Sequence, residues 1–346
     1  MNSFHTLSLF NFRLFKAKEF AFGPRVTCII GPNARGKTTI LEAIFFLLTG
    51  KSFRTSKPFQ LLKHGESAFK LSSTFEKYKV LQKLSMSYEE GQRKIHHNGT
   101  VYSSHARLLG IVPVVVLTPN DVALIRGEPL YRRAFLDLHL SLSDPLYLYY
   151  LLRYTKALRQ RNVLVRANQP KEMSIWEEEM GKAAAYISQS RLHFLEDLRK
   201  PLEEYYQKLT DRSDSLQATL NLKEKMPSFD YYKALWKETR SRDIKWGYTS
   251  VGPHKDDFSL CLSDKEAKLY ASEGEQRLLA SVLKCAEVQR MKKQLEVDPL
   301  LLIDDFGVGL DDERKNRFIH TLQEFPQVIL SSTHQTFPSQ FATIKL

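Results

Sequence analysis

The sequence predicts an α/β fold: a sheet-based head built from both ends of the chain, with a helical lobe inserted between them. Strand-like segments fill residues 1–120 and return at about residue 244. The stretch between them is rich in Leu, Arg, Lys, Glu and Tyr, with apolar residues at helical spacing. We therefore predict a discontinuous head at residues 1–120 and 245–346 and a lobe at residues 121–244. A chain of 346 residues is long enough for both to bury a core.

The N-terminal part of the head alternates short strands with one buried helix. Its predicted elements are strands at 6–12, 19–22 and 26–30, a helix at 37–48, strand-like sequence at 66–98 with turns at 90–91 and 98–99, and an apolar strand at 112–117. The helix has apolar residues on most sides, as expected for a helix that is buried against a sheet.

The lobe is predicted to consist of several helices between Tyr131 and about Gln207. Prolines should divide it, since Pro removes a backbone donor and clashes with the preceding turn. These prolines are Pro145, Pro170 and Pro201. One apolar stripe at helical spacing is formed by Leu148, Leu151, Leu152, Thr155 and Leu158.

Charge is distributed unevenly along the chain, whose formal net charge is +12. Residues 1–120 contain 17 Lys and Arg against 6 Asp and Glu, whereas residues 121–346 contain 34 against 33. A one-sided basic surplus is typical of proteins that bind a polyanion such as DNA. The sequence has no apolar run long enough for a membrane span and no secretory signal, and its three scattered cysteines suit a reducing compartment. We expect a cytoplasmic protein with no membrane partner.

The strongest motif lies directly after the strand at 26–30. Residues 31–38 read Gly-Pro-Asn-Ala-Arg-Gly-Lys-Thr, a complete G-x-x-x-x-G-K-T that opens a helix. Backbone amides of such a loop wrap phosphates, the lysine reaches the β- and γ-phosphates, and the threonine hydroxyl holds Mg²⁺. The sequence therefore predicts an ATP and Mg²⁺ site. Its nucleotide-binding residues are Gly31, Pro32, Asn33, Ala34, Arg35, Gly36, Lys37, Thr38 and Thr39.

A second motif, at residues 299–305, ends an apolar run with two acids. Pro-Leu-Leu-Leu-Ile describes a buried parallel strand that delivers Asp304 and Asp305 at its carboxyl end, where α/β ligand sites lie. In a P-loop protein the first acid holds Mg²⁺ and the second acts on the attacking water. We therefore predict that Asp304 is a metal-binding residue, together with Thr38, and that Asp305 is catalytic.

A third motif introduces a helix at residues 278–290. Ser272, Gly274 and Gln276 place a hydroxyl and flexible backbone at the amino end of that helix, which forms a second phosphate-binding surface. The alternative is a plain capping box formed by Ser272 and Glu275. One ATP needs only one P-loop, so the second surface indicates an ABC-type ATPase head in which each subunit completes its neighbour's site. ATP would then hold a homodimer together.

The spacing of these motifs separates the classes of such ATPases. Lys37 lies 235 positions before Ser272, whereas transporter ATPase subunits place the two elements much closer together. The inserted lobe is also too short for the long coiled coils of chromosome-maintenance proteins, which leaves a short-arm head. A transporter-type nucleotide-binding subunit and a P-loop small-molecule kinase stay as alternatives, although the kinase would leave the Ser272 segment unexplained.

Further segments resemble the RecF family over nearly the whole chain. The matching segments are Gly50–Thr55, Leu117–Asp121, Arg126–Pro129, Arg132–Asp137, Gln160–Asn162, Trp176, Gly252–Asp257 and Ser272–Arg277. The resemblance implies an ATPase that loads onto DNA at gaps or stalled forks with RecO- and RecR-like partners. It also implies roles in recombinase loading and the SOS response, with ATP turnover that works as a switch.

Two places depart from the family pattern or leave a role open. Val308-Gly309 stands where the family has Ser-Glu after its paired acids, which puts signalling between the two sites of a dimer in question. His334 follows an apolar strand, where related ATPases sense the γ-phosphate; the alternative is a loop histidine. We therefore predict His334 as a second candidate catalytic residue, in addition to Asp305.

Basic residues follow the P-loop helix closely. Lys51, Arg54, Lys57 and Lys63 are predicted to contact the DNA backbone, which gives affinity without sequence specificity. Two alternatives remain open here. Arg54 could instead contact nucleotide or serve a structural role, and Arg132 and Arg133 could pair with acids of the lobe.

Overall fold

The computed structural model describes residues 3–104, 108–295, 297–333 and 336–346. The chain divides into two compact units. Unit 1 comprises Met1–Asp121, Glu204–Arg212 and Glu273–Leu346, and unit 2 comprises Val122–Glu203 and Ser213–Ser272.

This division differs from the predicted one in two places. Residues 245–272 group with unit 2, because β10 (Phe258–Leu262) pairs with β9 (Leu216–Leu220) in a small antiparallel sheet completed by β11 (Lys265–Glu266). Residues 204–212 group with unit 1, where Tyr205 stacks on Phe325 and Lys208 forms an ion pair with Glu324. Both differences arise from tertiary contacts that local sequence patterns do not encode.

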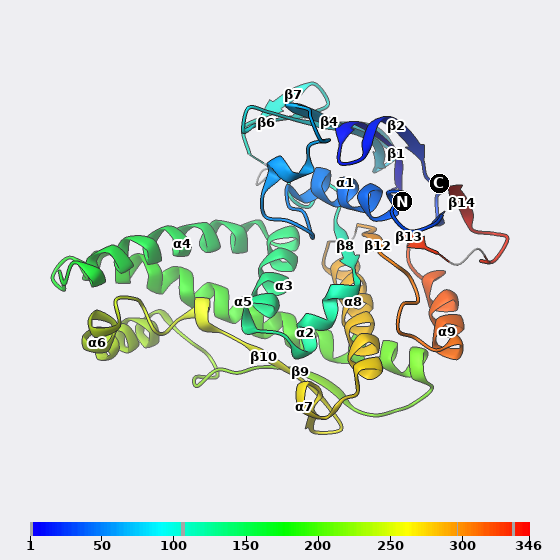
Figure 1. Ribbon diagram of the computed structural model, residues 1–346. Helices are drawn as coiled ribbons and strands as arrows, with labels where there is room; N and C mark the ends of the chain where they lie inside the picture. Colours follow the sequence, from blue (N-terminus) through cyan, green and yellow to red (C-terminus); the bar gives the residue numbers. More distant parts are fainter. Residues whose placement is uncertain (1–2, 105–107, 296, 334–335) are drawn as a thin grey trace. The chain divides into compact units, whose positions relative to one another are not determined.

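Unit 1 contains an antiparallel sheet with the strand order β2-β1-β4-β5-β6-β7. Its strands are β1 (Ser3–Phe12), β2 (Phe15–Ala21), β4 (Ala68–Lys77), β5 (Val80–Glu89), β6 (Gln92–His97) and β7 (Thr100–Tyr102). Buried and accessible side chains alternate along β4 and β5, so one face of the sheet is apolar. That face packs on helix α1 (Lys37–Thr49), which lies beneath the sheet in Figure 1. This explains why α1 is apolar on most sides.

A second sheet in unit 1 is parallel throughout, with the order β14-β3-β13-β12-β8. Its strands are β3 (Val26–Ile30), β8 (Val114–Leu117), β12 (Leu300–Ile303), β13 (Gln327–Ser332) and β14 (Ala342–Lys345). The four strands β3, β8, β12 and β13 are buried along their whole length, as parallel strands covered on both faces should be. Helices α1 and α8 (Glu273–Leu295) both contact β8, and α9 (Asp312–Leu322) connects β12 to β13. The carboxyl ends of β3, β12 and β13 therefore meet at one edge.

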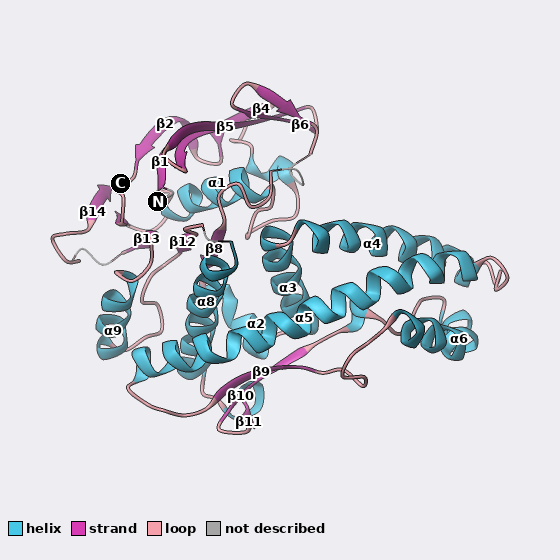
Figure 2. Cartoon of the chain, turned by 180° about the vertical axis from the view of Figure 1, so that it is seen from behind, coloured by secondary structure: helices cyan, strands magenta, loops and turns pink. Residues whose placement is uncertain are grey.

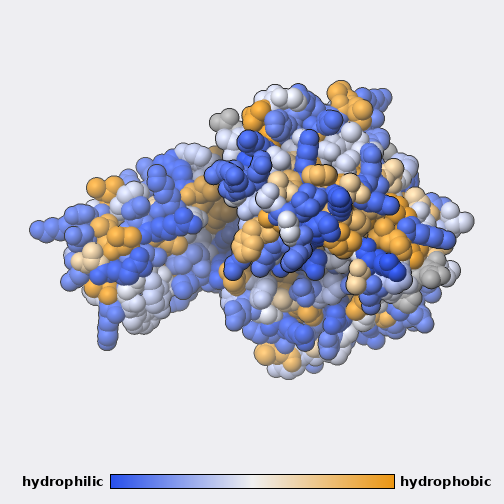
Figure 3. Space-filling model, turned by 45° about the horizontal axis from the view of Figure 1, so that its top comes forward, coloured by the Kyte–Doolittle hydropathy of each residue, from blue (hydrophilic) through white to orange (hydrophobic). Residues whose placement is uncertain are grey.

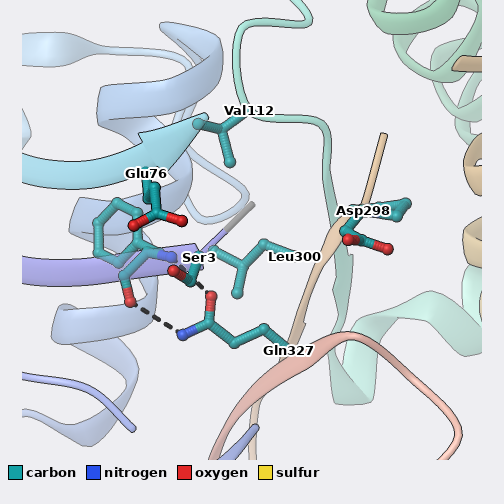
Figure 4. Close-up of a pocket in the computed structure, with 8 residues that line it drawn as sticks. Ser3, Glu76, Val112, Asp298, Leu300 and Gln327 are labelled. Atoms are coloured by element: carbon teal, nitrogen blue, oxygen red, sulfur yellow. Dashed lines mark hydrogen bonds between the residues drawn. The ribbon is translucent and has the colours of Figure 1, made fainter. Parts of the chain in front are cut away.

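Gln327 joins the two sheets of unit 1. Its amide accepts a hydrogen bond from the Phe4 backbone N–H at 2.7 Å and donates to the Phe4 carbonyl at 2.9 Å, as Figure 4 shows. The same amide nitrogen donates to the carbonyl of Gly23 at 2.8 Å. The hollow beside Gln327, between Glu76 and Asp298, has a volume of about 10 Å³, so it has room for no more than a water molecule. Gln327 therefore has a structural role: it holds the antiparallel sheet against the parallel one.

Unit 2 is built mainly from helices. They are α2 (Ala123–Arg126), α3 (Pro129–Ser143), α4 (Pro145–Arg166), α5 (Met173–Thr210, whose last turns belong to unit 1), α6 (Phe229–Trp246) and α7 (Ala267–Tyr270). Helices α4 and α5 run side by side in Figures 1 and 2, with the rings of Tyr150 and Tyr186 4.8 Å apart. Pro145 begins α4, and Pro170 lies in the connection to α5, as predicted.

Two expectations about these helices are wrong. Pro201 does not divide the lobe, since α5 continues through it. A proline inside a helix costs roughly 3 kcal/mol, and burial of Leu198, Leu202 and Leu209 around it offsets that cost. The apolar stripe of α4 is also displaced: Leu152 is 57% exposed, whereas the buried side chains of α4 are Tyr147, Tyr154, Ala157, Arg161 and Val165.

Two fully buried arginines bind the segments of unit 2 to one another. Arg161 on α4 pairs with Glu177 of α5 at 3.0 Å and with Asp243 of α6 at 2.8 Å. Arg191 on α5 pairs with Asp137 of α3 at 2.7 Å and with Asp256 at 2.8 Å. Removing one partner of a buried ion pair costs about 3–5 kcal/mol, because the other charge is left uncompensated. Several motifs that carry the family resemblance thus serve this core.

Arg132 and Arg133 belong to the same structural framework. Arg132 forms a bidentate pair with Asp257, and Arg133 donates to the backbone carbonyl of Asp256. Arg132 thus pairs with an acid of unit 2, as the alternative expected, whereas the contact of Arg133 is to a backbone carbonyl and not to a carboxylate. Among the helices of the described residues, none has the length and apolar run needed to cross a membrane.

His254 gives unit 2 a pH-dependent stability. One ring nitrogen lies 2.7 Å from the Tyr154 hydroxyl and the other 2.9 Å from the Thr249 carbonyl, an arrangement that a neutral ring satisfies. Burial lowers the pKa of His254 to about 4. The unfolded chain, with an ordinary histidine, binds a proton at higher pH than the folded chain, so stability is present above about pH 6.5 and is lost as the pH falls toward 4.

We expect the free energy of unfolding, measured by urea denaturation, to fall between pH 7 and pH 5 more steeply in the wild type than in His254→Phe. The variant loses two hydrogen bonds and should be less stable at every pH, yet it has no proton to take up at this position. Equal slopes in the two proteins would show that His254 does not titrate on unfolding.

Candidate nucleotide site

The glycine-rich loop leaves the end of β3 and leads directly into α1. Gly36 adopts φ = +99°, a conformation that favours glycine, and an added Cβ would lie 2.7 Å from the Phe15 ring. At the start of the loop, a Cβ on Gly31 would lie 2.9 Å from the carbonyl oxygen of Leu346. Neither position of the loop therefore has room for a side chain in this backbone path.

Lys37 occupies the first position of α1 and is 4% exposed. Its ammonium group donates to the carbonyls of Gly31 at 2.7 Å and Pro32 at 2.9 Å, so the side chain folds under the loop. A buried cation in this position suits a ligand with several negative charges.

A hollow of about 330 Å³ opens in front of the loop. That volume is within the range of small-ligand sites. Its lining residues are Leu14, Asn33, Ala34, Gly36, Lys37, Thr38, Thr39, Arg54 and Asp305. Six of the nine predicted loop residues line it, whereas the exposed Arg35 does not. Backbone amides, a lysine and an arginine in one hollow fit a polyphosphate.

Thr38 and Asp304 meet at the edge of this hollow, although they are 266 positions apart in the sequence. The Thr38 hydroxyl donates to the Asp304 carboxylate at 2.9 Å, and the Ser331 hydroxyl donates to the same oxygen at 2.7 Å. Burial raises the pKa of Asp304, while these two hydrogen bonds act in the opposite direction. A hydroxyl beside a carboxylate is a suitable oxygen donor set for Mg²⁺. The parallel sheet thus brings the two predicted metal-binding residues together.

Asp305 lines the hollow itself and has a left-handed backbone, with φ = +49°. Its N–H donates to the Ser331 hydroxyl at 2.8 Å, which holds this conformation in place. A non-glycine residue in this region costs of order 1 kcal/mol or more and persists only where its surroundings fix it. The placement is consistent with a carboxylate that is positioned to act on water.

Glu42, in the middle of α1, organises the far side of the site and was missed in the sequence. It is fully buried, and it accepts hydrogen bonds from Arg13, Ser52 and Arg54. Arg54 is thereby anchored where it lines the hollow, an arrangement that fits both the structural and the nucleotide-contacting alternatives for this residue. The available signal was an acid inside an apolar helix, next to an arginine-containing family segment.

The Ser272 segment lies at the amino end of α8. Ser272 is exposed, Gly274 has open space where a side chain would begin, and Gln276 is buried. Among the described residues, the lining of the hollow includes none of these three. Within unit 1, the hollow is therefore lined without Gly274 and Gln276, as far as the described residues extend.

A second hollow, of about 420 Å³, is lined mainly by the segment that follows α1. Lys51 and Arg93 line it together with the hydroxyl residues Ser52, Thr55 and Ser56. Lys57 is exposed, and Lys63 donates to the carbonyl of Leu14 at 3.4 Å. His334 lies outside the described residues, so its predicted sensor role stays a prediction.

Comparison with known proteins gives consistent matches. A family model described as an AAA domain matches residues 6–242. The DNA replication and repair protein RecF of Protochlamydia amoebophila is 38% identical over 343 residues, which cover 96% of this chain and 94% of the relative.

Two solved structures are also similar. A structure of the recombination mediator protein RecF with ATP, in the RecFOR pathway, has a TM-score of 0.89 and 28% identity and covers 99% of this chain and 95% of the other. The Smc head bound to the C-terminal winged-helix domain of ScpA has a TM-score of 0.59 at 17% identity, over 96% of this chain and 90% of the other. Together with the two sheets described above, these likenesses confirm the predicted α/β fold of an ABC-type head.

The roles of the two acids can be separated by substitution. We expect Asp304→Asn to abolish Mg²⁺-dependent ATP hydrolysis, because it removes a charged oxygen from the pair with Thr38. Asp305→Asn should still bind ATP and Mg²⁺ but stop cleavage, because the amide cannot accept a proton from water. Hydrolysis and binding of a fluorescent ATP analogue would be measured side by side.

Asp312→Asn is a matched control, since it removes one negative charge from an exposed position in the same segment. It should leave both measurements unchanged. Normal hydrolysis by a folded Asp304→Asn protein would contradict the assignment of the metal site.

Proposed function

The chain belongs to the RecF family of DNA replication and repair proteins, and from this premise we propose that it is an ATP-dependent DNA-binding switch. The observation that carries the proposal is the phosphate hollow, in which the P-loop, Thr38, Arg54 and Asp305 converge from distant parts of the sequence. ATP is the nucleotide and Mg²⁺ its metal, since the related RecF structure contains ATP and the donor set of this chain fits the ion.

We infer that ATP is part of a homodimer interface. The amino end of α8 carries Ser272 and Gly274, a feature suited to bind phosphate, yet Gly274 is not among the described residues that line the hollow of its own unit. A twofold dimer would place the Ser272 segment of each chain against the ATP in the P-loop of the other. ATP would then favour dimers by mass action, and loss of the γ-phosphate would release them. Turnover should accordingly be slow and switch-like.

We propose that DNA contacts unit 1 through the segment after α1. No acidic residue occurs between Lys51 and Gly65, and Lys51 and Arg93 line one hollow there. Figure 3 turns forward the antiparallel sheet at the top of Figure 1, and hydrophilic side chains predominate on that face, with scattered apolar patches between them. Contacts of this kind track the phosphate backbone without reading bases.

The cellular context follows from the relatives. Because a related structure is assigned to the RecFOR pathway, we propose that the partners of this chain are RecO- and RecR-like proteins that assist recombinase loading and the SOS response. A cytoplasmic location is part of the same proposal. The transporter and small-molecule kinase alternatives are not favoured by any of these likenesses.

DNA binding should depend steeply on salt, because binding to phosphates releases counterions. Reversing Lys57 and Lys63 to Glu should weaken binding equally for unrelated DNA sequences. It should also lower the slope of log K against log salt by about 1.4 to 1.8, the amount expected for two lost phosphate contacts. Fluorescence anisotropy at several salt concentrations would measure both effects.

Reversing Lys223 and Lys225 to Glu is the control, because it changes the net charge equally at exposed positions of unit 2. This control should keep the wild-type slope. If both double variants lose the same affinity, net charge rather than the proposed segment governs binding.

Ser272→Arg should bind ATP through its own P-loop but fail to dimerise, because a bulky side chain fills the space that the phosphate of the partner's ATP needs. Ser272→Ala leaves that space open and is the matched control. A purely capping role would instead cost about 1 kcal/mol of stability in both variants, with no ATP-dependent effect.

Mixing Ser272→Arg with Lys37→Ala sharpens this comparison, because the mixed dimer keeps one composite site intact. Sedimentation with ATP should therefore show dimers in the mixture and none with Ser272→Arg alone. ATP-driven dimerisation of Ser272→Arg at the wild-type level would contradict the composite site.

A further inference from the structure

The loop that follows Asp305 is wound tightly. Asp305, Gly307 and Gly309 all have left-handed backbones, with φ of +49°, +83° and +76°. Two backbone hydrogen bonds close successive turns: the N–H of Val308 donates to the Asp305 carbonyl at 3.2 Å, and that of Leu310 to the Gly307 carbonyl at 3.3 Å. Short, hydrogen-bonded turns therefore link Gly309 to Asp305.

Gly309 packs against the side chain of Arg277, which projects from α8. A Cβ built on Gly309 would lie 2.5 Å from Cδ and 2.9 Å from Nε of Arg277. Any side chain at position 309 would thus displace the arginine. The absence of a side chain at Gly309 is what gives Arg277 room to lie on the loop.

Arg277 is also tied to the amino end of its own helix. Its guanidinium donates to the Glu273 carboxylate at 2.9 Å, one turn earlier, and Glu273 directly follows Ser272. The arginine therefore touches two structures at once: the turn that begins α8, and the loop that carries Asp305.

We propose that Arg277, seated on Gly309, is a positioning residue that couples the two ATP sites of the dimer. The inference rests on the proposed dimer, in which the amino end of α8 meets the partner's ATP. When that phosphate binds, it fixes the first turn of α8 and, through Glu273, the side chain of Arg277. The fixed arginine then holds Gly309, and the loop from Gly309 holds Asp305 in the chain's own site. Because the strained backbone of Asp305 needs its surroundings to hold it, this packing acts together with the Ser331 hydrogen bond to place the carboxylate.

Gly309→Ala tests the contact without deleting the arginine. The added methyl group displaces Arg277, and we expect ATP hydrolysis per dimer to fall by about tenfold, equivalent to 1.36 kcal/mol of barrier. ATP affinity and ATP-driven dimerisation should stay within about twofold of the wild type. Either free energy would then change by much less than the 1.4 kcal/mol that corresponds to a tenfold change. Sedimentation, analogue binding and single-turnover hydrolysis would be measured on the full chain.

Gly307→Ala is the matched control. Gly307 lies in the same loop with the same left-handed strain, but a Cβ there meets only the flexible Lys315 side chain, at 3.2–3.3 Å. It should therefore reproduce the strain of Gly309→Ala without displacing Arg277, and it should keep near-wild-type hydrolysis. Equal losses in the two variants would attribute the effect to backbone strain and overturn the proposal.

A double-mutant cycle with Arg277→Ala completes the test. If the contact carries the coupling, Arg277→Ala lowers hydrolysis about as much as Gly309→Ala does, and the double variant is no slower than either single variant. Losses that multiply in the double variant would overturn the proposal, as would wild-type hydrolysis in Gly309→Ala. A wild-type chain that stays monomeric with ATP would instead contradict the dimer itself, whatever the variants do.

Discussion

The parallel register of β3, β13 and β12 is the constraint on which the site depends. It places the end of the P-loop strand, Ser331 and Asp304 at one edge of the sheet, where these three strands are buried along their whole length. Thr38 follows β3 and Asp304 follows β12, and the two side chains meet because only β13 separates these strands. Ser331, at the end of β13, hydrogen-bonds to both Asp304 and Asp305 for the same reason. The chemistry of the hollow is thus assembled from both ends of the chain by one set of backbone pairings.

The remaining structure supports that edge from different sides. Glu42 anchors Arg54 beside the phosphate loop, and Gln327 fixes the antiparallel sheet to the parallel one. In unit 2 the buried Arg161 and Arg191 form ion pairs with four acids from separate segments. Three of the eight family-like segments, Arg132–Asp137, Gln160–Asn162 and Gly252–Asp257, contribute to these buried pairs, which shows that a family pattern can mark core electrostatics as well as catalytic groups.

A feature of the structure could be predicted from the sequence when the residues that determine it lie close together in the chain. The P-loop and the paired acids were predictable because strand, turn and helix signals lie within a few residues of one another. The contact of Arg277 with Gly309, the role of Glu42 and the placement of residues 204–212 were not, since each depends on packing between distant segments. The prediction that Pro201 ends a helix was wrong, because the free-energy cost of a helical proline is smaller than the stabilisation from the side chains buried around it. The prediction that Leu152 belongs to the buried stripe was wrong, because apolar spacing alone does not identify which face of α4 is covered.

The central claim is that ATP joins two copies of this chain and that its hydrolysis separates them. Sedimentation velocity of the wild-type protein with Mg²⁺ and ATP, with Mg²⁺ and ADP, and without nucleotide tests it most directly. We predict dimers with ATP and monomers in the other two conditions. A sedimentation coefficient that is the same in all three would contradict the account.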